Sequence, residues 1–282
     1  MKLLGEVLNL SIQYLKEKSV TSPRLVAETL LSHVLDAKRM DLYLRFECPL
    51  EEKELSIFRA LLKKASLGEP VEYILSTSSF YGLNLDLSPQ VLIPRPETEI
   101  LVDQMAKLLE LEGVEEKVLL DLCSGSGCIG LSLKKKFPAL SVTLSDISLE
   151  ALALSKKSAE KNSLDVTFLQ GDLLAPFSSK KADYVVCNPP YISKLEYEGL
   201  DFSVKGYEPK LALVGGETGL EFYQRLALDL PSHLKPGAKV FLEIGMAQGE
   251  ALNEIFSSSC WVKKELRQDW SGKDRFFFLE IE

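Results

Sequence analysis

Residues 118–130 read VLLDLCSGSGCIG, and this stretch decides the fold. The apolar run Val118–Leu122 predicts a buried strand. The glycines that follow allow the backbone to turn sharply and let a ligand approach closely. A helix then begins near Ile129, and its N-terminal N–H groups would face that ligand. Because the stretch contains the G-x-G-x-x-G fingerprint, it predicts a Rossmann-like strand, turn and helix that bind a cofactor.

Strands and helices alternate along the chain after this stretch. Further strands are predicted at Val142–Ser145, Val166–Leu169, Tyr184–Cys187, Lys239–Ile244, Trp261–Leu266 and Phe276–Ile281. Helices are predicted at Ile129–Lys136, Leu149–Lys161, Leu220–His233 and Ala247–Phe256. The alternation predicts an α/β fold with a mostly parallel sheet that helices cover on both faces.

The N-terminal quarter of the chain has a different pattern. Residues 1–70 repeat apolar positions at helical spacing, which predicts a small helical bundle. Residues 71–92 alternate apolar and polar side chains around Tyr81-Gly82, which predicts a connecting β-hairpin. Residues 93–282 would form the α/β domain, in which prolines hold the first segment extended and a helix begins at about Glu97.

Polar side chains end the predicted strands on one edge of the sheet. Asp146 ends the second strand and Asp172 follows the third. The fourth strand ends in Asn188-Pro189-Pro190-Tyr191, because two prolines cannot continue a sheet ladder. An amide, unpaired carbonyls and an aromatic ring predict a clamp for a planar group that carries NH₂. Ligands of open α/β sheets bind at this edge.

Composition narrows the function further. The chain has 282 residues. Its formal net charge of −8 and its pI near 5.1 argue against tight binding of duplex nucleic acid. It has no run of about 18 apolar residues and no signal-peptide pattern, so we expect a cytoplasmic protein without a membrane span. Five cysteines without a C-x-x-C pair and two histidines favour neither a disulfide framework nor a metal site.

Taken together, these features resemble the release factor glutamine methyltransferase family, class I enzymes that use S-adenosylmethionine. The resemblance rests on the glycine loop, the two strand-end acids and the Asn188–Tyr191 motif. It also rests on four further motifs, Ile93–Glu99, Glu208–Leu213, Gly215–Leu220 and Asp269–Arg275. It implies a seven-stranded Rossmann-like sheet whose last strand is antiparallel. It also implies that the N-terminal helical domain helps to recognise the release factor.

The resemblance implies a role for individual residues. The cofactor S-adenosylmethionine would contact Cys123, Ser124, Gly125, Ser126, Gly127, Asp146, Asp172, Leu173 and Asn188. Among these, Asp146 would hold the ribose hydroxyls, and Asp172 and Leu173 would border the adenine. The substrate would contact Asn188, Pro189, Pro190 and Tyr191. Asn188, Pro189 and Tyr191 would be the catalytic residues, and no metal ion would take part.

Two positions near the cofactor loop raise separate expectations. Many family members have glycine where this chain has Cys123, and a small thiol should fit there if φ is negative. Asp121 would either orient the loop or face the amino acid end of the cofactor, and a plain polar strand end is nearly as good an interpretation.

The implied reaction is methylation of a glutamine side-chain amide nitrogen, N5, in the Gly-Gly-Gln motif of peptide chain release factors, which supports translation termination. The Asn188 side-chain oxygen and the Pro189 carbonyl would accept both hydrogens of the NH₂ group. Tyr191 would pack on the flat amide. Positioning, rather than a strong base, would supply most of the rate.

Several alternatives share these features. The substrate could instead be a glutamine of a ribosomal protein, or adenine N6 in nucleic acid, although the latter would need a basic face. A non-catalytic binding module could keep the same fold. A dehydrogenase would explain the glycine loop but would leave the Asn188–Tyr191 motif unexplained. We expect a monomer whose partner is a release factor and which makes no sequence-specific contact with nucleic acid.

Overall fold

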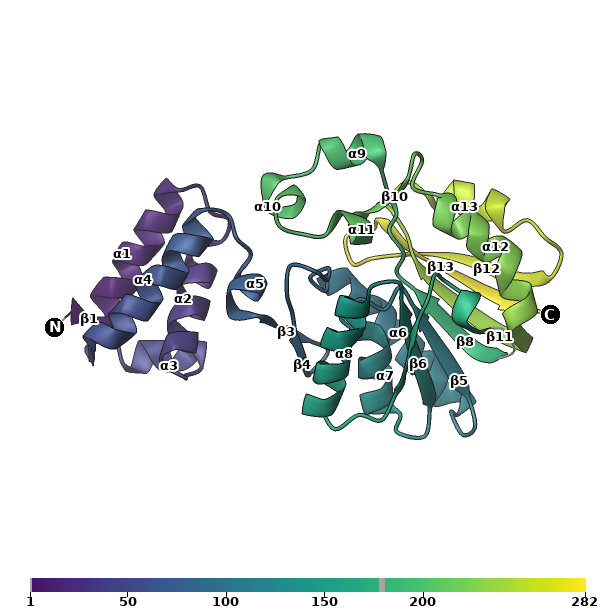
Figure 1. Cartoon of the computed structure of the whole chain (residues 1–282), viewed down its shortest axis with the longest axis horizontal. Helices are drawn as coiled ribbons and strands as arrows, with labels where there is room; N and C mark the ends of the chain where they lie inside the picture. Colours follow the sequence, from purple (N-terminus) through teal and green to yellow (C-terminus); the bar gives the residue numbers. More distant parts are fainter. Residues whose placement is uncertain (1, 178–180) are drawn as a thin grey trace. The chain divides into compact units, whose positions relative to one another are not determined.

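A computed structural model describes residues 2–177 and 181–282 of the chain (Figure 1). Contacts between Cα atoms divide the chain into two compact units. The first comprises Met1–Thr77 together with the separate segment Asp201–Tyr207. The second comprises Ser78–Leu200 and Glu208–Glu282.

The first unit is helical, as the periodicity of residues 1–70 predicts. Its helices are α1 Leu4–Glu17, α2 Pro23–Val34, α3 Arg39–Leu44, α4 Glu52–Ser66, α5 Val71–Leu75 and α10 Phe202–Lys205. Two short strands, β1 Lys2–Leu3 and β2 Pro49–Leu50, pair antiparallel. The apolar stripes of these helices bury one another, with Leu15, Leu30 and Phe58 almost fully covered, so the unit has its own core.

One prediction in this region is wrong for part of its length. Residues 71–92 were expected to alternate as a hairpin, but Val71–Leu75 forms the helix α5. Pro70 precedes its first turn, where proline is tolerated because no N–H partner is needed. The hairpin itself is shorter and comprises β3 Thr77–Phe80 and β4 Leu83–Asp86. It joins α8, since the Asp86 main-chain N–H donates to Ser158 Oγ at 2.9 Å.

The second unit contains the predicted seven-stranded sheet. Its strands are β5 Val118–Leu122, β6 Ser141–Asp146, β7 Thr167–Gln170, β8 Ala182–Cys187, β11 Leu234–Glu243, β12 Trp261–Gln268 and β13 Asp274–Ile281. They lie in the order β12-β13-β11-β8-β5-β6-β7. The pairs from β11 to β7 are parallel, while β13 is antiparallel to both of its neighbours. The last strand is therefore antiparallel, as predicted.

Helices cover both faces of this sheet (Figure 1). One face buries α6 Pro96–Glu112, α7 Cys128–Lys136 and α8 Leu149–Lys161 in a first apolar cluster. The other face buries α12 Glu221–His233 and α13 Gly249–Ile255 in a second cluster. The fold class is therefore the predicted Rossmann-like α/β fold, with a mostly parallel sheet between two layers of helices. Shorter elements follow β7 and β8, namely the 3₁₀ turn Ala175–Phe177, β9 Ile192–Ser193, α9 Lys194–Glu198, α11 Lys210–Leu213 and β10 Val214–Gly216.

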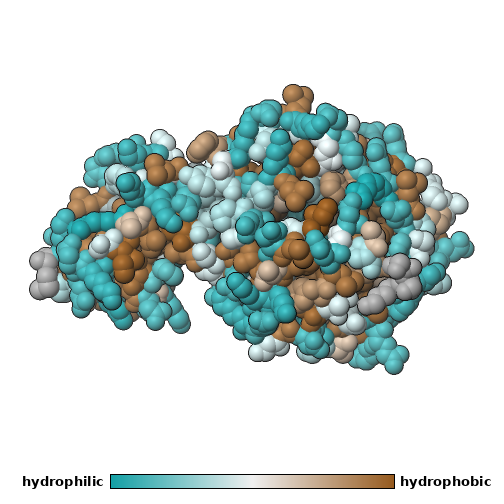
Figure 2. All heavy atoms as spheres, viewed as in Figure 1, coloured by the Kyte–Doolittle hydropathy of each residue, from teal (hydrophilic) through white to brown (hydrophobic). Residues whose placement is uncertain are grey.

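Apolar residues are also exposed on the surface. On the face shown in Figure 2, hydrophobic residues appear among the hydrophilic ones that cover much of it. The side chains of Leu195 and Trp270 are among the most exposed large apolar groups in the second unit. Among the helices of the described residues, none combines the length and apolar character that crossing a bilayer requires.

Candidate active site

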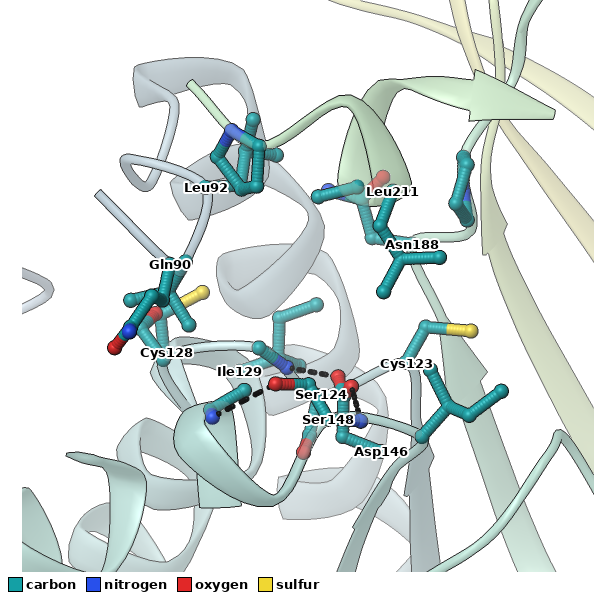
Figure 3. A pocket seen from close by; sticks show the side chains of 18 of the residues that line it. Gln90, Leu92, Cys123, Ser124, Cys128, Ile129, Asp146, Ser148, Asn188 and Leu211 are labelled. Carbon is teal, nitrogen blue, oxygen red and sulfur yellow. Dashed lines mark hydrogen bonds between the residues drawn. The ribbon is translucent and has the colours of Figure 1, made fainter. Parts of the chain in front are cut away.

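A cavity opens in the second unit where the parallel strands end (Figure 3). The residues after β5, β6, β7 and β8 meet there because parallel strands bring their carboxyl ends to one edge. The segment before α6 and parts of α11 and α12 complete the wall. Eight of the nine predicted cofactor residues line the cavity: Cys123, Ser124, Gly125, Ser126, Asp146, Asp172, Leu173 and Asn188.

The ninth, Gly127, lies behind the wall and shapes the loop. It caps α7 with φ +77°, in the left-handed region that favours glycine. A Cβ at this position would lie 2.8 Å from Cδ2 of Leu144 on β6. A Cβ at Gly130 would similarly lie 2.8 Å from Asp121 Oδ2. Both glycines therefore let α7 pack closely against the sheet, which places its first turn beside the cavity.

The condition under which Cys123 was expected to fit is not met. Its φ is +53°, in the left-handed region, whereas the thiol was expected to fit a negative φ. This conformation costs a non-glycine residue roughly 1–2 kcal/mol. Leu173, on the wall of the same cavity, also has a positive φ of +51°. Strain of this kind gathers at functional sites, where the surrounding structure holds it.

Asp146 holds the loop from the end of β6. Its Oδ2 accepts from the Gly125 main-chain N–H at 2.8 Å, and its Oδ1 accepts from the Ser148 N–H at 2.9 Å (Figure 3). Burial raises the pKa of this carboxyl above its ordinary value. Each carboxylate oxygen can accept more than one hydrogen bond, so Asp146 can also take hydroxyl donors from the cavity.

Asp121 lies beneath the loop, and it is not among the residues that line the cavity. Its Oδ2 accepts from the Gly130 N–H at 2.8 Å, while its buried Oδ1 has no partner. Burial raises the pKa of this carboxyl to about 7, and the nearby Asp146 charge adds to the shift. Of the interpretations considered for Asp121, the geometry favours orienting the loop.

The other end of the cavity contains residues that the sequence did not indicate. Arg225 Nη2 donates to Asp172 Oδ2 at 2.7 Å, and both residues line the cavity. Phe222, one turn earlier on α12, lines it as well, and its ring lies 5.9 Å from the Arg225 guanidinium carbon. Leu173 offers an aliphatic surface to the cavity, and Phe222 adds an aromatic one. No local pattern on α12 distinguishes these two residues from an ordinary amphipathic face.

The four residues of the predicted clamp lie at the end of β8. Asn188 and Pro190 line the cavity, whereas Pro189 and Tyr191 are outside its wall. Burial raises the pKa of the Tyr191 phenol to about 12, although the charges of Arg275 and Arg95 oppose the shift. The phenol therefore stays protonated at neutral pH, which suits a packing role better than that of a general base.

The flanking motifs converge on this clamp. A Cβ at Gly215 would lie 2.2 Å from the Pro190 carbonyl oxygen, so only glycine allows that approach without a shift. Gln248 Nε2 donates to the Tyr191 carbonyl oxygen at 2.9 Å. Arg95, which lines the cavity, donates to Glu208 Oε1 at 2.6 Å. These contacts tie the motifs Ile93–Glu99, Glu208–Leu213 and Gly215–Leu220 to the same site.

Comparisons with known proteins agree with this architecture. Family profiles match the PrmC N-terminal domain over residues 6–75 and the methyltransferase small domain over residues 96–200. A release factor glutamine methyltransferase of Chlamydia trachomatis serovar D is 42% identical over 278 residues, which are 98% of this chain and 94% of that protein. One of Geobacter sulfurreducens is 37% identical over 272 residues, which are 96% and 94%.

A solved structure supports the fold alone. The Thermus thermophilus 16S rRNA methyltransferase, in complex with AdoMet and guanosine, matches with a TM-score of 0.51 and 20% identity. The match covers 73% of this chain and 50% of that one.

Proposed function

We propose that this chain, which belongs to the release factor glutamine methyltransferase family, methylates N5 of the glutamine in the Gly-Gly-Gln motif of peptide chain release factors. The observation that supports this most is the position of Asn188. It lies on the wall of the same cavity as the glycine loop and Asp146, so a planar NH₂ group held there would face a bound cofactor.

The residues of the cavity fit S-adenosylmethionine. Asp146 offers carboxylate oxygens for ribose hydroxyls, and the loop of Ser124 to Ser126 lets a ligand approach its backbone. Phe222 and Leu173 offer apolar surface for the adenine at the other end. When bound, the cofactor supplies a methyl group that its sulfonium already activates.

The protein's own contribution is to hold the substrate nitrogen. An amide nitrogen is a weak nucleophile because its lone pair is delocalised into the carbonyl. The Asn188 side-chain oxygen and the Pro189 carbonyl would accept the two N–H groups, which turns the lone pair toward the cavity. Tyr191, neutral and next to these residues, would pack on the amide plane. Orientation of this kind can account for much of the rate without a strong base.

The proposed substrate also suggests what the helical unit does and where in the cell the enzyme works. Like the family resemblance, it implies that the helices of residues 1–70 recognise the body of the release factor. Because release factors act on ribosomes, we also propose that the enzyme works in the cytoplasm.

The function is tested by incubating the protein with a labelled methyl donor and purified release factor, then mapping the labelled peptide by mass spectrometry. We expect one methyl group on the motif glutamine, and none on a factor whose motif glutamine is changed to alanine. Parallel incubations contain ribosomal proteins, DNA or RNA. Label on a ribosomal protein or on a nucleic acid, with none on the release factor, would overturn the proposal.

A further inference from the structure

Glu243 is a buried acid that the proposed mechanism does not use. It is the last residue of β11, and its side chain is 1% exposed. In the parallel pairing of β11 with β8, Leu242 is the partner of Cys187. The next residue on each strand is Glu243 and Asn188, so the acid lies beside the clamp.

Two polar side chains define the surroundings of its carboxyl group. Thr98 Oγ1, on α6, donates to Glu243 Oε2 at 2.7 Å. The Asn188 side-chain amide is the other neighbour, and it lowers the pKa of Glu243 as a hydrogen-bond donor does. An ionised carboxylate only accepts hydrogen bonds, so Asn188 must present its NH₂ group to Glu243. The Asn188 oxygen then points away from Glu243 and is free to accept from a substrate.

We infer that Glu243 is a positioning residue that orients the Asn188 amide for catalysis. The two ends of an asparagine amide are almost equal in shape, so packing alone does not choose between them. The reversed amide would present NH₂ to the substrate NH₂, and two donors cannot bond to each other. This inference rests on the proposed function, because the selected oxygen is the one that accepts from the glutamine amide.

The selection depends on the charge of Glu243. Once protonated, the acid carries an O–H that can donate to the Asn188 oxygen, which stabilises the reversed amide. Burial raises the pKa of Glu243 to about 7, and Glu97 opposes ionisation further. Thr98, Arg275 and Asn188 favour the ionised form, but less strongly than burial disfavours it.

Two tyrosines and a cysteine near Glu243 stay protonated in this range, whereas Asp121, beneath the glycine loop, also titrates at about pH 7. The buried Tyr191 has a pKa of about 12, and burial raises the pKa values of Tyr223 and Cys128 well above neutrality. Glutamine methylation should therefore rise with pH as Glu243 ionises around neutrality.

The first experiment measures single-turnover methylation of release factor from pH 6 to 8.5. In wild type the rate should fall as the pH is lowered, with an apparent pKa near 7, and this part of the pH–rate profile is called the acid limb. In Glu243→Gln either amide orientation is possible, so the rate at pH 8 should fall about 10- to 100-fold and the limb should vanish. Glu243→Asp, which restores a charge, should restore a limb. An unchanged rate and limb in Glu243→Gln would overturn the inference.

Glu112→Gln is the matched control. Glu112 accepts from the Tyr184 hydroxyl at 2.8 Å outside the cavity, and although burial opposes ionisation, Lys239 and Tyr184 lower its pKa below the ordinary value. It is ionised throughout the tested range, so the control should keep the wild-type limb. If Glu243→Gln does not fold, Thr98→Val serves instead. Losing the Thr98 hydrogen bond should move the limb to higher pH, and an unmoved limb would contradict the inference.

A second readout does not need the substrate. In protein labelled with ¹⁵N-asparagine, the Asn188 side-chain amide signal is assigned by its loss in Asn188→Ala. The chemical shift of this signal should change with pH with an apparent pKa near 7 in wild type and should stay constant in Glu243→Gln. A signal that does not respond to pH in wild type would overturn the inference even if the release factor proves not to be the substrate. The reverse result, titration without methylation of the factor, would overturn only the proposed function.

Discussion

At the scale of single residues, the site combines strained backbone and buried acids with the polar side chain of Asn188 on the cavity wall. Cys123 and Leu173 keep positive φ angles at the cavity wall. Asp121 and Glu243 are acids with pKa values raised to about 7 by burial. These features cost stability, and the two large apolar clusters on either face of the sheet offset that cost.

Asn188→Ala should separate binding from chemistry. The variant loses the acceptor for the substrate NH₂ but leaves the glycine loop and Asp146 in place. We expect the single-turnover rate to fall by roughly 10²–10³, as for loss of one oriented polar contact to reacting atoms. The cofactor Kd, measured by calorimetry, should change by less than about threefold, which is under 1 kcal/mol. Asn253→Ala, on an exposed position of α13, is the control, and a wild-type rate in Asn188→Ala would refute the assignment.

Asp121 should make folding stability depend on pH. Its pKa rises from 3.8 to about 7 on folding. The folded state therefore favours the protonated acid, so its stabilising contribution is complete below about pH 4 and is lost as pH rises through about 7. The loss is at most about 4 kcal/mol, since one pKa unit corresponds to about 1.4 kcal/mol.

Asp121→Asn removes this titration. Between pH 5 and 8, urea unfolding of the apo protein should show a smaller decline in the free energy of unfolding than wild type shows. Glu243 contributes a decline of the same sign, so part of the slope should remain. Equal slopes for the variant and wild type would contradict the raised pKa of Asp121.

At the scale of elements, the decisive unit is β5, the glycine loop and α7. The loop turns tightly enough that its backbone bonds to Asp146 on the neighbouring strand. The helix that follows then lies so close to β6 that a Cβ at its N-cap does not fit. The position of this helix, rather than any single loop side chain, sets the shape of the cofactor end of the cavity.

Gly127→Ala tests this packing against a matched control. Gly127 and Gly237 have nearly equal positive φ angles, +77° and +74°. A Cβ at Gly127 meets Leu144 at 2.8 Å, whereas a Cβ at Gly237 meets nothing within 4 Å. Gly237→Ala should therefore cost about 1–2 kcal/mol of unfolding free energy, from backbone strain alone.

Gly127→Ala should cost about 1–3 kcal/mol more, because overpacking adds to the strain. It should also weaken cofactor binding, since α7 must move away from the sheet. Equal losses of stability in the two variants, measured by urea unfolding, would show that the close approach of α7 to β6 does not matter.

At the scale of the whole molecule, the chain forms two units with separate cores. The helical unit includes Asp201–Tyr207, which comes from the middle of the catalytic sequence. Within that unit the Tyr207 hydroxyl donates to the Leu67 carbonyl at 3.1 Å, and the rings of Phe202 and Tyr207 meet edge to face. The cavity, in contrast, is lined entirely by residues of the second unit.

Deleting residues 2–77 should therefore preserve cofactor binding. The remaining unit keeps both of its apolar clusters and every residue that lines the cavity. Calorimetry should give a cofactor Kd within about threefold of the full chain. Circular dichroism and a cooperative thermal transition would show that the fragment is folded. A folded fragment that binds no cofactor would mean that the helical unit is needed to form the cavity.

Local sequence patterns determined the positions of most strands and helices and of many residues that line the cavity. Apolar runs of four to six residues and helical periodicity placed the strands and helices of the sheet within a few residues, because burial on both faces requires those patterns. The antiparallel last strand followed from the family resemblance. The two prolines after Cys187 ended β8 for a local reason, the missing N–H donors. The residues that line the cavity at the ends of β5 to β8 followed from the same strand boundaries.

Only the tertiary structure decided which distant groups meet. Nothing in the sequence near Asn188 indicates Glu243, and the register of β11 on β8 brings them together. The pairing of Arg225 with Asp172, the helix at Val71–Leu75 and the positive φ of Cys123 were likewise not predicted. The physical reason is that periodicity records whether a side chain is buried. It does not record which neighbour the side chain is buried against, and parallel strands gather their neighbours from far along the chain.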